Sequence, residues 1–139
     1  MSEDIAQRLG LRVPIREEAD VGVARRRVRE VARRAGLRES AVEALATAIS
    51  EVAQNILVHA RAGEILLGVM RDRGWTEVVT VARDDGPGIA DVALAMQDGY
   101  STAKGLGLGL SSARRLVDEF EVSGAAGRGT TVIMRKWDG

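Results

Sequence analysis

Residues 99–116 read GYSTAKGLGLGLSSARRL, and in this stretch Gly105, Gly107 and Gly109 alternate with leucines directly before a helical pattern. Glycine inside a regular helix or strand costs roughly 0.5–1 kcal/mol relative to alanine. The stretch therefore predicts a loop followed by a helix over Leu110–Phe120. The exposed N–H groups of such a loop and the N-terminus of the next helix favour an anion. This pattern is typical of a phosphate-binding loop, although its composition also fits a plain flexible linker.

Lys104 directly precedes the first of these glycines and could bring a flexible positive charge to a terminal phosphate. The loop does not follow the P-loop pattern G-x-x-x-x-G-K-[ST]. It also lacks the preceding strand of a Rossmann fingerprint. A phosphate site here would therefore be neither a P-loop nor a Rossmann site, and residues elsewhere in the chain would have to supply the remaining contacts to the ligand.

The composition indicates one folded domain and excludes several kinds of site. The chain has 139 residues, of which 45% are hydrophobic and 29% are charged. We expect a single domain over residues 1–139, with a loose N-terminus at residues 1–10. Cysteine is absent and His59 is the only histidine, so a disulfide framework and a multi-histidine metal site are excluded. We expect His59 to be a partly buried residue at the end of a helix.

Charge and hydropathy favour a cytoplasmic protein. The chain carries 20 basic and 20 acidic residues, which argues against a nucleic-acid-binding protein. The basic run at residues 25–34 includes a glutamate and fits a solvated amphipathic helix better than a nucleic-acid patch. No apolar run reaches the ~18 residues of a membrane span. The first ten residues lack the pattern of a signal peptide. We therefore expect neither nucleic acid nor membrane among the partners.

Hydrophobic periodicity predicts an α+β fold, a two-layer α/β sandwich with helices on one face of a mixed, mostly antiparallel sheet. Pro14 suits an edge strand. Ser40 and Glu43 have the spacing of a capping box. The predicted helices cover residues 17–35, 40–60, 89–96 and 110–120, and the predicted strands cover residues 11–15, 63–70, 76–83, 120–123 and 130–136.

Glu51 and Asn55 lie four residues apart on the second predicted helix and share a face away from its apolar stripe. An amide oxygen can bind a hard cation such as Mg²⁺. A carboxylate one turn away can orient or deprotonate a hydroxyl group. By itself the pair also fits two ordinary solvated side chains.

The segment Asp84-Asp85-Gly86-Pro87-Gly88 directly follows a predicted strand. Gly86 and Gly88 would let the backbone approach a ligand closely. An aspartate at the end of a strand can accept a hydrogen bond from the exocyclic amine of a base. The alternative is an ordinary turn, which the same residues also form.

In their order along the chain, these segments resemble the ATP-binding domain of the gyrase, Hsp90, histidine-kinase and MutL superfamily. That superfamily combines an E-x-x-x-N helix, a D-x-G-x-G turn, a glycine-rich lid and a late G-x-G-T. Here the four motifs read EVAQN, DDGPG, GLGLG and GRGT, the last of these ending at Thr130. The resemblance covers roughly residues 40–137 and implies a Bergerat-type ATP-binding fold.

The short chain narrows the resemblance to the anti-sigma family of serine/threonine kinases in bacterial partner-switching systems. Within that family, NILVHA (55–60), residues 84–110 and RRLVDEF (114–120) look most like the RsbT-type switch kinases of the stressosome. The resemblance implies an ATP- and Mg²⁺-dependent protein kinase. Its substrate would be a STAS-domain protein, and it would also bind and activate a PP2C-type phosphatase.

The resemblance also implies a role for each motif residue. Asn55 would bind the Mg²⁺ that bridges the phosphates, and Glu51 would act as the base for the substrate serine. Asp84 would bind the adenine amino group with help from Thr130. The remaining nucleotide contacts would come from Gly86, Gly88, Lys104, Gly105, Gly107, Gly109 and Leu110.

Two other functions use the same ATP site. One is an anti-sigma factor that sequesters a sigma subunit and phosphorylates its antagonist to release it. The other is a nucleotide-binding scaffold with little transfer activity, against which the intact Glu51 argues. The motifs do not separate the kinase from the anti-sigma factor, whereas the identity of the protein partner would.

Overall fold

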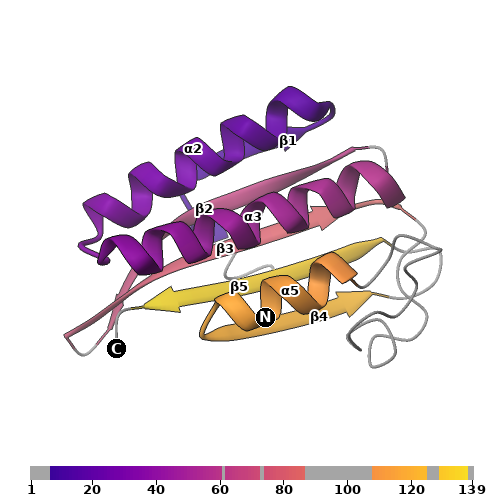
Figure 1. The fold of residues 1–139 in the computed structure, drawn as a ribbon. Helices are drawn as coiled ribbons and strands as arrows, with labels where there is room; N and C mark the ends of the chain where they lie inside the picture. The colour runs from indigo at the N-terminus through magenta and orange to yellow at the C-terminus, as the bar shows by residue number, and fades with distance from the viewer. Residues whose placement is uncertain (1–6, 61, 73, 87–107, 125–128, 138–139) are drawn as a thin grey trace.

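The longest helix, α3 (Glu39–His59), crosses one face of a five-stranded sheet (Figure 1). This computed structural model describes residues 7–60, 62–72, 74–86, 108–124 and 129–137. By length and a mean hydropathy of 1.3, α3 is the one helix in this part of the chain that could span a membrane. A core helix passes the same test. The buried side chains of α3 are Ala41, Val42, Leu45, Ala46, Ala48, Ile49, Val52, Ala53 and Ile56.

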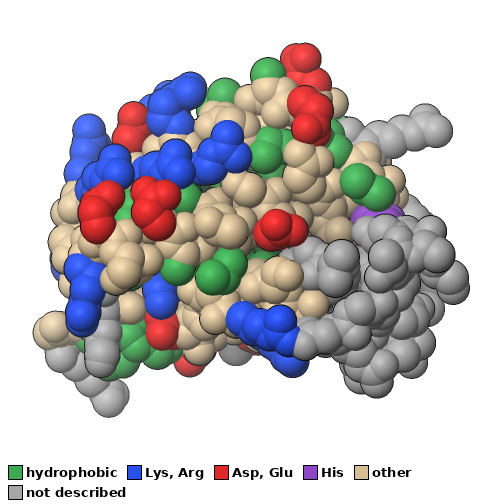
Figure 2. Space-filling model, in the orientation of Figure 1, with side chains coloured by type: hydrophobic (Ala, Val, Ile, Leu, Met, Phe, Trp, Pro, Cys, Tyr) green, Lys and Arg blue, Asp and Glu red, His purple; other side chains and the backbone are tan. Residues whose placement is uncertain are grey.

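A second helix, α2 (Glu18–Arg34), lies beside α3 and buries an apolar stripe (Val21, Ala24, Val28 and Ala32). Arg29 binds Glu43 of α3 through two hydrogen bonds of 3.1 and 2.9 Å, across the junction of the two helices. Basic and acidic side chains are intermixed over α2 and the beginning of α3 (Figure 2). The arginine-rich helix is therefore a solvated amphipathic helix with salt bridges to its neighbour, as its sequence predicts.

The sheet has the strand order β1-β2-β3-β5-β4, and all four described pairings are antiparallel. The strands are β1 (Leu11–Ile15), β2 (Gly63–Asp72), β3 (Trp75–Asp84), β4 (Glu119–Gly124) and β5 (Thr130–Trp137). The expected α+β sandwich is confirmed, with α2, α3 and α5 (Leu108–Leu116) over one face (Figure 1). The strand containing Pro14 is an edge strand, as predicted.

Alternate residues of each strand point to the two faces of the sheet. The face toward the helices joins the main core through side chains such as Ile65, Val78 and Met134. The opposite face carries a smaller buried cluster of Leu66, Val79, Val81 and Ile133, and Leu9 packs against it. The sheet is therefore covered on both sides, and α2, α3 and α5 lie on one of them.

Two predictions about helix ends are wrong. The helix α3 begins after Arg38 without a side-chain cap, whereas the capping box belongs to α2, where the Glu17 backbone N–H is bound by the Asp20 carboxylate at 3.1 Å. The last helix ends at Leu116 rather than Phe120, because the next residues pair with β5. The backbone N–H of Asp118 donates to the carbonyl of Arg135 at 3.0 Å. The predicted helix over residues 89–96 lies outside the described residues.

Candidate functional site

The candidate site lies at one end of the sheet, where β3 ends, β5 begins and α3 ends. Asp84 is the last residue of β3 and is paired with Gly63 of β2 and Thr130 of β5. The turn after Asp84 passes against Ala60, which follows the last residue of α3. Residues far apart in sequence thus meet around one carboxylate.

The Asp84 carboxylate is half-buried and fixed by the backbone. Its Oδ1 accepts the N–H of Gly86 at 2.8 Å, and the backbone N–H of Thr130 also donates to the carboxylate. Burial raises the pKa of Asp84 above its ordinary value, and the two backbone hydrogen bonds and the nearby His59 act in the opposite direction. His59, in the last turn of α3, is half-buried, as predicted. The site therefore holds an oriented acceptor that is partly shielded from water.

Glycines surround Asp84 because no larger residue fits there. A Cβ atom at Gly86 would lie 2.7 Å from the Cβ of Ala60. Gly129 has a φ of +81°, and a Cβ atom there would lie 2.1 Å from the Asp84 carbonyl oxygen. These two glycines, from the D-x-G-x-G and G-x-G-T motifs, allow their segments to pack directly on the backbone around Asp84.

Glu51 and Asn55 both lie on α3, and four residues of helix separate them by about 6 Å along the axis. Both are half-buried, and neither makes a hydrogen bond or ion pair with another described residue. Their polar groups are therefore accessible on the helix that ends beside Asp84. An amide and a carboxylate in this arrangement fit a hard cation and a hydroxyl group that must be oriented.

The helix α5 packs against α3, and its first turn contains Gly109 and Leu110. The Leu110 side chain is fully buried in the main core. Any contact of Leu110 with a nucleotide would therefore involve its backbone N–H, one of the unpaired donors of a first helical turn. Gly88, Lys104, Gly105 and Gly107 lie outside the described residues.

These groups are compatible with Mg-ATP. Asp84 offers a hydrogen-bond acceptor beside two glycines, and Asn55 offers an amide oxygen of the kind that can bind a hard cation. The N-terminus of α5 provides an end of positive partial charge. The arrangement therefore matches the chemistry of adenine, a divalent cation and phosphate.

Comparison with known proteins identifies the family. The family described as the histidine kinase-like ATPase domain matches residues 14–136. The chain belongs to this family. Among its relatives, the serine/threonine-protein kinase RsbT of Bacillus subtilis is 42% identical over 125 residues, which are 90% of this chain and 94% of that protein. The anti-sigma F factor of Caldanaerobacter subterraneus is 33% identical and matches 67% of this chain and 68% of its own.

Solved structures have the same histidine kinase-like fold. The RsbU and RsbW domains of a Mycobacterium tuberculosis protein match with a TM-score of 0.61 at 19% identity, covering 92% of this chain and 32% of that one. The histidine kinase domain of a blue-light-activated kinase from Erythrobacter litoralis matches with a TM-score of 0.52 at 22% identity, covering 85% of this chain and 63% of that one. The resemblance to RsbT-type serine/threonine kinases and the expected Bergerat-type fold are therefore confirmed.

Gly63 is a site residue that motif reasoning missed in this histidine kinase-like domain. A Cβ atom there would lie 2.6 Å from the Arg83 carbonyl oxygen, 2.9 Å from Cγ2 of Ile56 and 3.0 Å from the Cβ of Asp84. Gly63 therefore provides the space that the Asp84 side chain occupies between β2 and α3. An isolated glycine at the start of a predicted strand was the available signal, since such a glycine often marks a close backbone approach.

A hollow of about 460 Å³ lies behind Asp84 and is lined mainly by residues of β1, β2 and β3. Here Glu64 binds Arg12 and, at 2.6 Å, Arg83. These two arginines hold the pKa of Glu64 below its usual value. Because Glu64 alternates with the core-facing Ile65, this ionic group lies on the sheet face away from the helices. The ionic group of Arg12, Glu64 and Arg83 connects β1, β2 and β3 beside the candidate site.

Proposed function

We propose that the chain uses Mg-ATP to phosphorylate a serine of a STAS-domain protein in a bacterial partner-switching pathway. The observation that carries this proposal is the fixed, half-buried Asp84 carboxylate at the end of the helix that bears Glu51 and Asn55. The relationship to the kinase RsbT supports a protein as the phosphate acceptor.

In this proposal, Asp84 accepts the adenine amino group, and Thr130 adds a hydroxyl contact. The Asn55 amide oxygen binds Mg²⁺, which neutralises charge on the phosphates. The backbone of Gly86, Gly88, Gly105, Gly107 and Gly109 approaches the nucleotide, and Lys104 reaches a terminal phosphate. These residues act mainly by position and charge, which is the principal requirement of phosphoryl transfer.

Glu51 orients the serine hydroxyl and takes its proton. The serine oxygen forms a bond to the γ-phosphorus as the bond between that phosphorus and the β–γ bridging oxygen breaks. ADP leaves with the electron pair of the broken bond. Glu51 is suited to this step because it lies one turn before Asn55, so its carboxylate and the Asn55 amide share one helix face.

A second role is the binding of a regulatory protein. Similarity to anti-sigma F factors over 67% of the chain favours it. The bound protein would be a PP2C-type phosphatase that the kinase activates, or a sigma factor that it sequesters. Co-purification with a phosphatase or with a sigma factor would separate these two possibilities.

The test is a phosphotransfer assay with γ-labelled ATP, Mg²⁺ and the STAS-domain proteins encoded in the same genome. We expect label on a STAS serine with the native chain and at least a 100-fold lower rate with Glu51→Gln, because the hydroxyl loses its base. ATP affinity should persist in this variant. Glu43→Gln is the matched control, since Glu43 is exposed and lies eight residues earlier on α3. A Glu51→Gln chain with the native rate would contradict the assignment of the base.

A further inference from the structure

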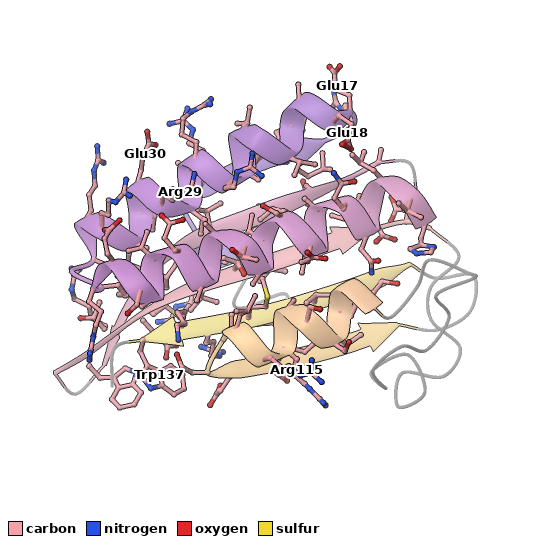
Figure 3. All side chains as sticks on the ribbon, viewed as in Figure 1. Glu17, Glu18, Arg29, Glu30, Arg115 and Trp137 are labelled. Atoms are coloured by element: carbon pink, nitrogen blue, oxygen red, sulfur yellow. The ribbon has the colours of Figure 1, made fainter. Side chains whose placement is uncertain are left out.

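Both tryptophans of the chain meet at the end of the sheet opposite Asp84. Trp75 begins β3 and Asp84 ends it, which places them about 30 Å apart. The ring centroids of Trp75 and Trp137 are 4.9 Å apart at an interplanar angle of 51°. Figure 3 shows Trp137 at this end of the molecule. Trp75 is 46% exposed, so this pair is a large aromatic surface remote from the nucleotide site.

Hydrogen bonds hold the pair in place. The indole N–H of Trp75 donates to Glu77 at 3.2 Å, and Glu77 accepts a hydrogen bond from Arg135 at 2.6 Å. The backbone N–H of Trp137 donates to Asp118 at 2.8 Å. An aromatic side chain that is already ordered loses little conformational entropy when a partner covers it. Such residues are also the commonest energetic centres of protein interfaces.

A notch of about 300 Å³ opens beside the two rings. We call it the tryptophan notch; its lining residues are Ala35, Gly36, Leu37, Gly74, Trp75, Thr76 and Trp137. Gly36 and Gly74 have φ values of +90° and +78°, and a Cβ atom at either would have no neighbour within 4 Å. The volume is at the lower limit of roughly 300–1,000 Å³ for ligand pockets. It suits a few side chains of a partner rather than a large cofactor.

Five described carboxylates in the elements that flank the tryptophan notch are already paired with cations. Those of Glu39, Glu43, Glu77, Asp118 and Glu119 each lie within 4 Å of an arginine or lysine nitrogen. Arg34, next to Ala35, and Arg71, opposite Thr76 in the ladder, have no such partner among the described residues. Arg34 and Arg71 are therefore two exposed positive charges without a partner among the described side chains, which favours a negatively charged partner.

We infer that the tryptophan notch is a docking surface for an acidic segment of a protein partner that carries a bulky apolar side chain. The apolar side chain packs against Trp75 and Trp137, and the acidic residues pair with Arg34 and Arg71. Because the notch and Asp84 are at opposite ends of the sheet, a partner seated here leaves the nucleotide end open. This inference goes beyond the proposed kinase activity and does not depend on it.

The test uses the intrinsic fluorescence of the full chain, because its only 2 tryptophans both line the notch. The probes are two synthetic peptides without aromatic residues and of equal length, which share two leucines and differ in having glutamates or lysines elsewhere. We expect a saturable blue shift with the glutamate peptide at half-saturation below ~1 mM. We expect little response to the lysine peptide.

Two charge reversals give a matched comparison. Arg71→Glu should weaken binding of the glutamate peptide about tenfold, because it replaces attraction by repulsion. The melting temperature should stay unchanged, because Arg71 is exposed. Arg16→Glu makes the same change at the opposite end of the sheet, beside the hollow behind Asp84, and should leave peptide binding unaltered.

Four results would overturn the inference. The first is no shift with up to ~1 mM glutamate peptide, and the second is an equal response to both peptides. The third is a shift with vesicles of anionic phospholipid alone, which would indicate a membrane-facing surface. The fourth is a shift that follows protein concentration without any probe, which would indicate that a second copy of the chain covers the notch.

Discussion

Gly63 shows how one missing side chain positions a functional group. Its strand is so close to Asp84 that a Cβ atom would lie 3.0 Å from the Asp84 Cβ. We expect Gly63→Ala to destabilise the fold by about 1–3 kcal/mol, the usual cost of an overpacked site. It should also weaken ATP binding, because Asp84 has to move. Denaturant unfolding and calorimetric titration with Mg-ATP would measure the two effects.

Gly68→Ala is the control for this prediction. It lies on the same strand, and its added Cβ atom would lie 3.2 Å from Cδ2 of Leu9, on the sheet face away from the helices. This variant should lose some stability and keep native ATP affinity. Equal losses of ATP affinity in both variants would mean that Gly63 acts through general stability rather than through Asp84.

The raised pKa of Asp84 predicts how the free energy of unfolding and the ATP affinity change with pH. Burial disfavours the ionised form, so the stabilising contribution of Asp84 is present at pH values below the pKa of the unfolded chain and is lost as pH rises through the folded pKa. In the proposed kinase, Asp84 has to be ionised to accept the adenine amino group, so ATP affinity should fall as pH drops through that same pKa. The proposed ATP binding therefore favours the ionised form of Asp84, whereas folding favours its protonated form.

The measurement compares the native chain with Asp84→Asn, without nucleotide, across the acidic and neutral range. The unfolding free energy of the variant relative to the native chain should increase as pH rises through the folded pKa of Asp84. Its ATP binding should be lost at every pH. A pH-independent difference between the two chains, or native ATP affinity in the variant, would refute this role for the carboxylate.

At the scale of elements, the central strand β3 contains a polar residue that the core does not satisfy. The Thr80 side chain is fully buried, and its Oγ1 has no hydrogen-bond partner in the part of the chain that the structure describes. Thr80→Val keeps the shape and removes a hydroxyl whose burial without a partner costs about 1–3 kcal/mol. We expect a higher melting temperature. Ser111→Ala, at a buried residue of α5 that has a partner, should lower it.

Elements with strong periodicity could be predicted from the sequence, and their ends could not. The stripe on α3 and the β2–β3 hairpin follow directly from the spacing of apolar residues. The predicted end of α5 was wrong because Phe120 continues the apolar spacing of the helix. In the structure, pairing with Met134 of β5 determines the conformation of Phe120. Long-range pairing has no local signature in the sequence.

The candidate site was predictable where motifs carry it and not where packing does. Asp84, Gly86 and Thr130 form a recognisable order of residues, and the structure brings these three together. The need for Gly63 arises only from the approach of β2 to β3 and to Ile56 on α3. Such a requirement depends on the register of two strands, which the sequence does not state.

For the whole molecule, the important feature is that both faces of the sheet carry buried apolar clusters, a large one under the helices and a small one on the opposite face. Helices cover one, and on the other Leu9 is 8% exposed and packs against Leu66, Val79, Val81 and Ile133. Gly68 lies directly below Leu9 and leaves room for it. The lead-in to β1 is thus part of the fold, although the sequence predicted a loose N-terminus up to residue 10.

Truncation of Leu9 tests how much this smaller cluster contributes. We expect Leu9→Ala to cost about 1–3 kcal/mol and Leu45→Ala, in the fully buried main core, about 2–5 kcal/mol. Leu9→Met preserves volume and should cost less than about 1.5 kcal/mol. Leu9→Asp should in addition increase the binding of an apolar dye, because the outer face of the sheet loses its cover. If Leu9→Ala and Leu9→Asp both unfold like the native chain and bind no more dye, the segment before β1 does not cover this face in solution, and the main core alone accounts for the stability of the fold.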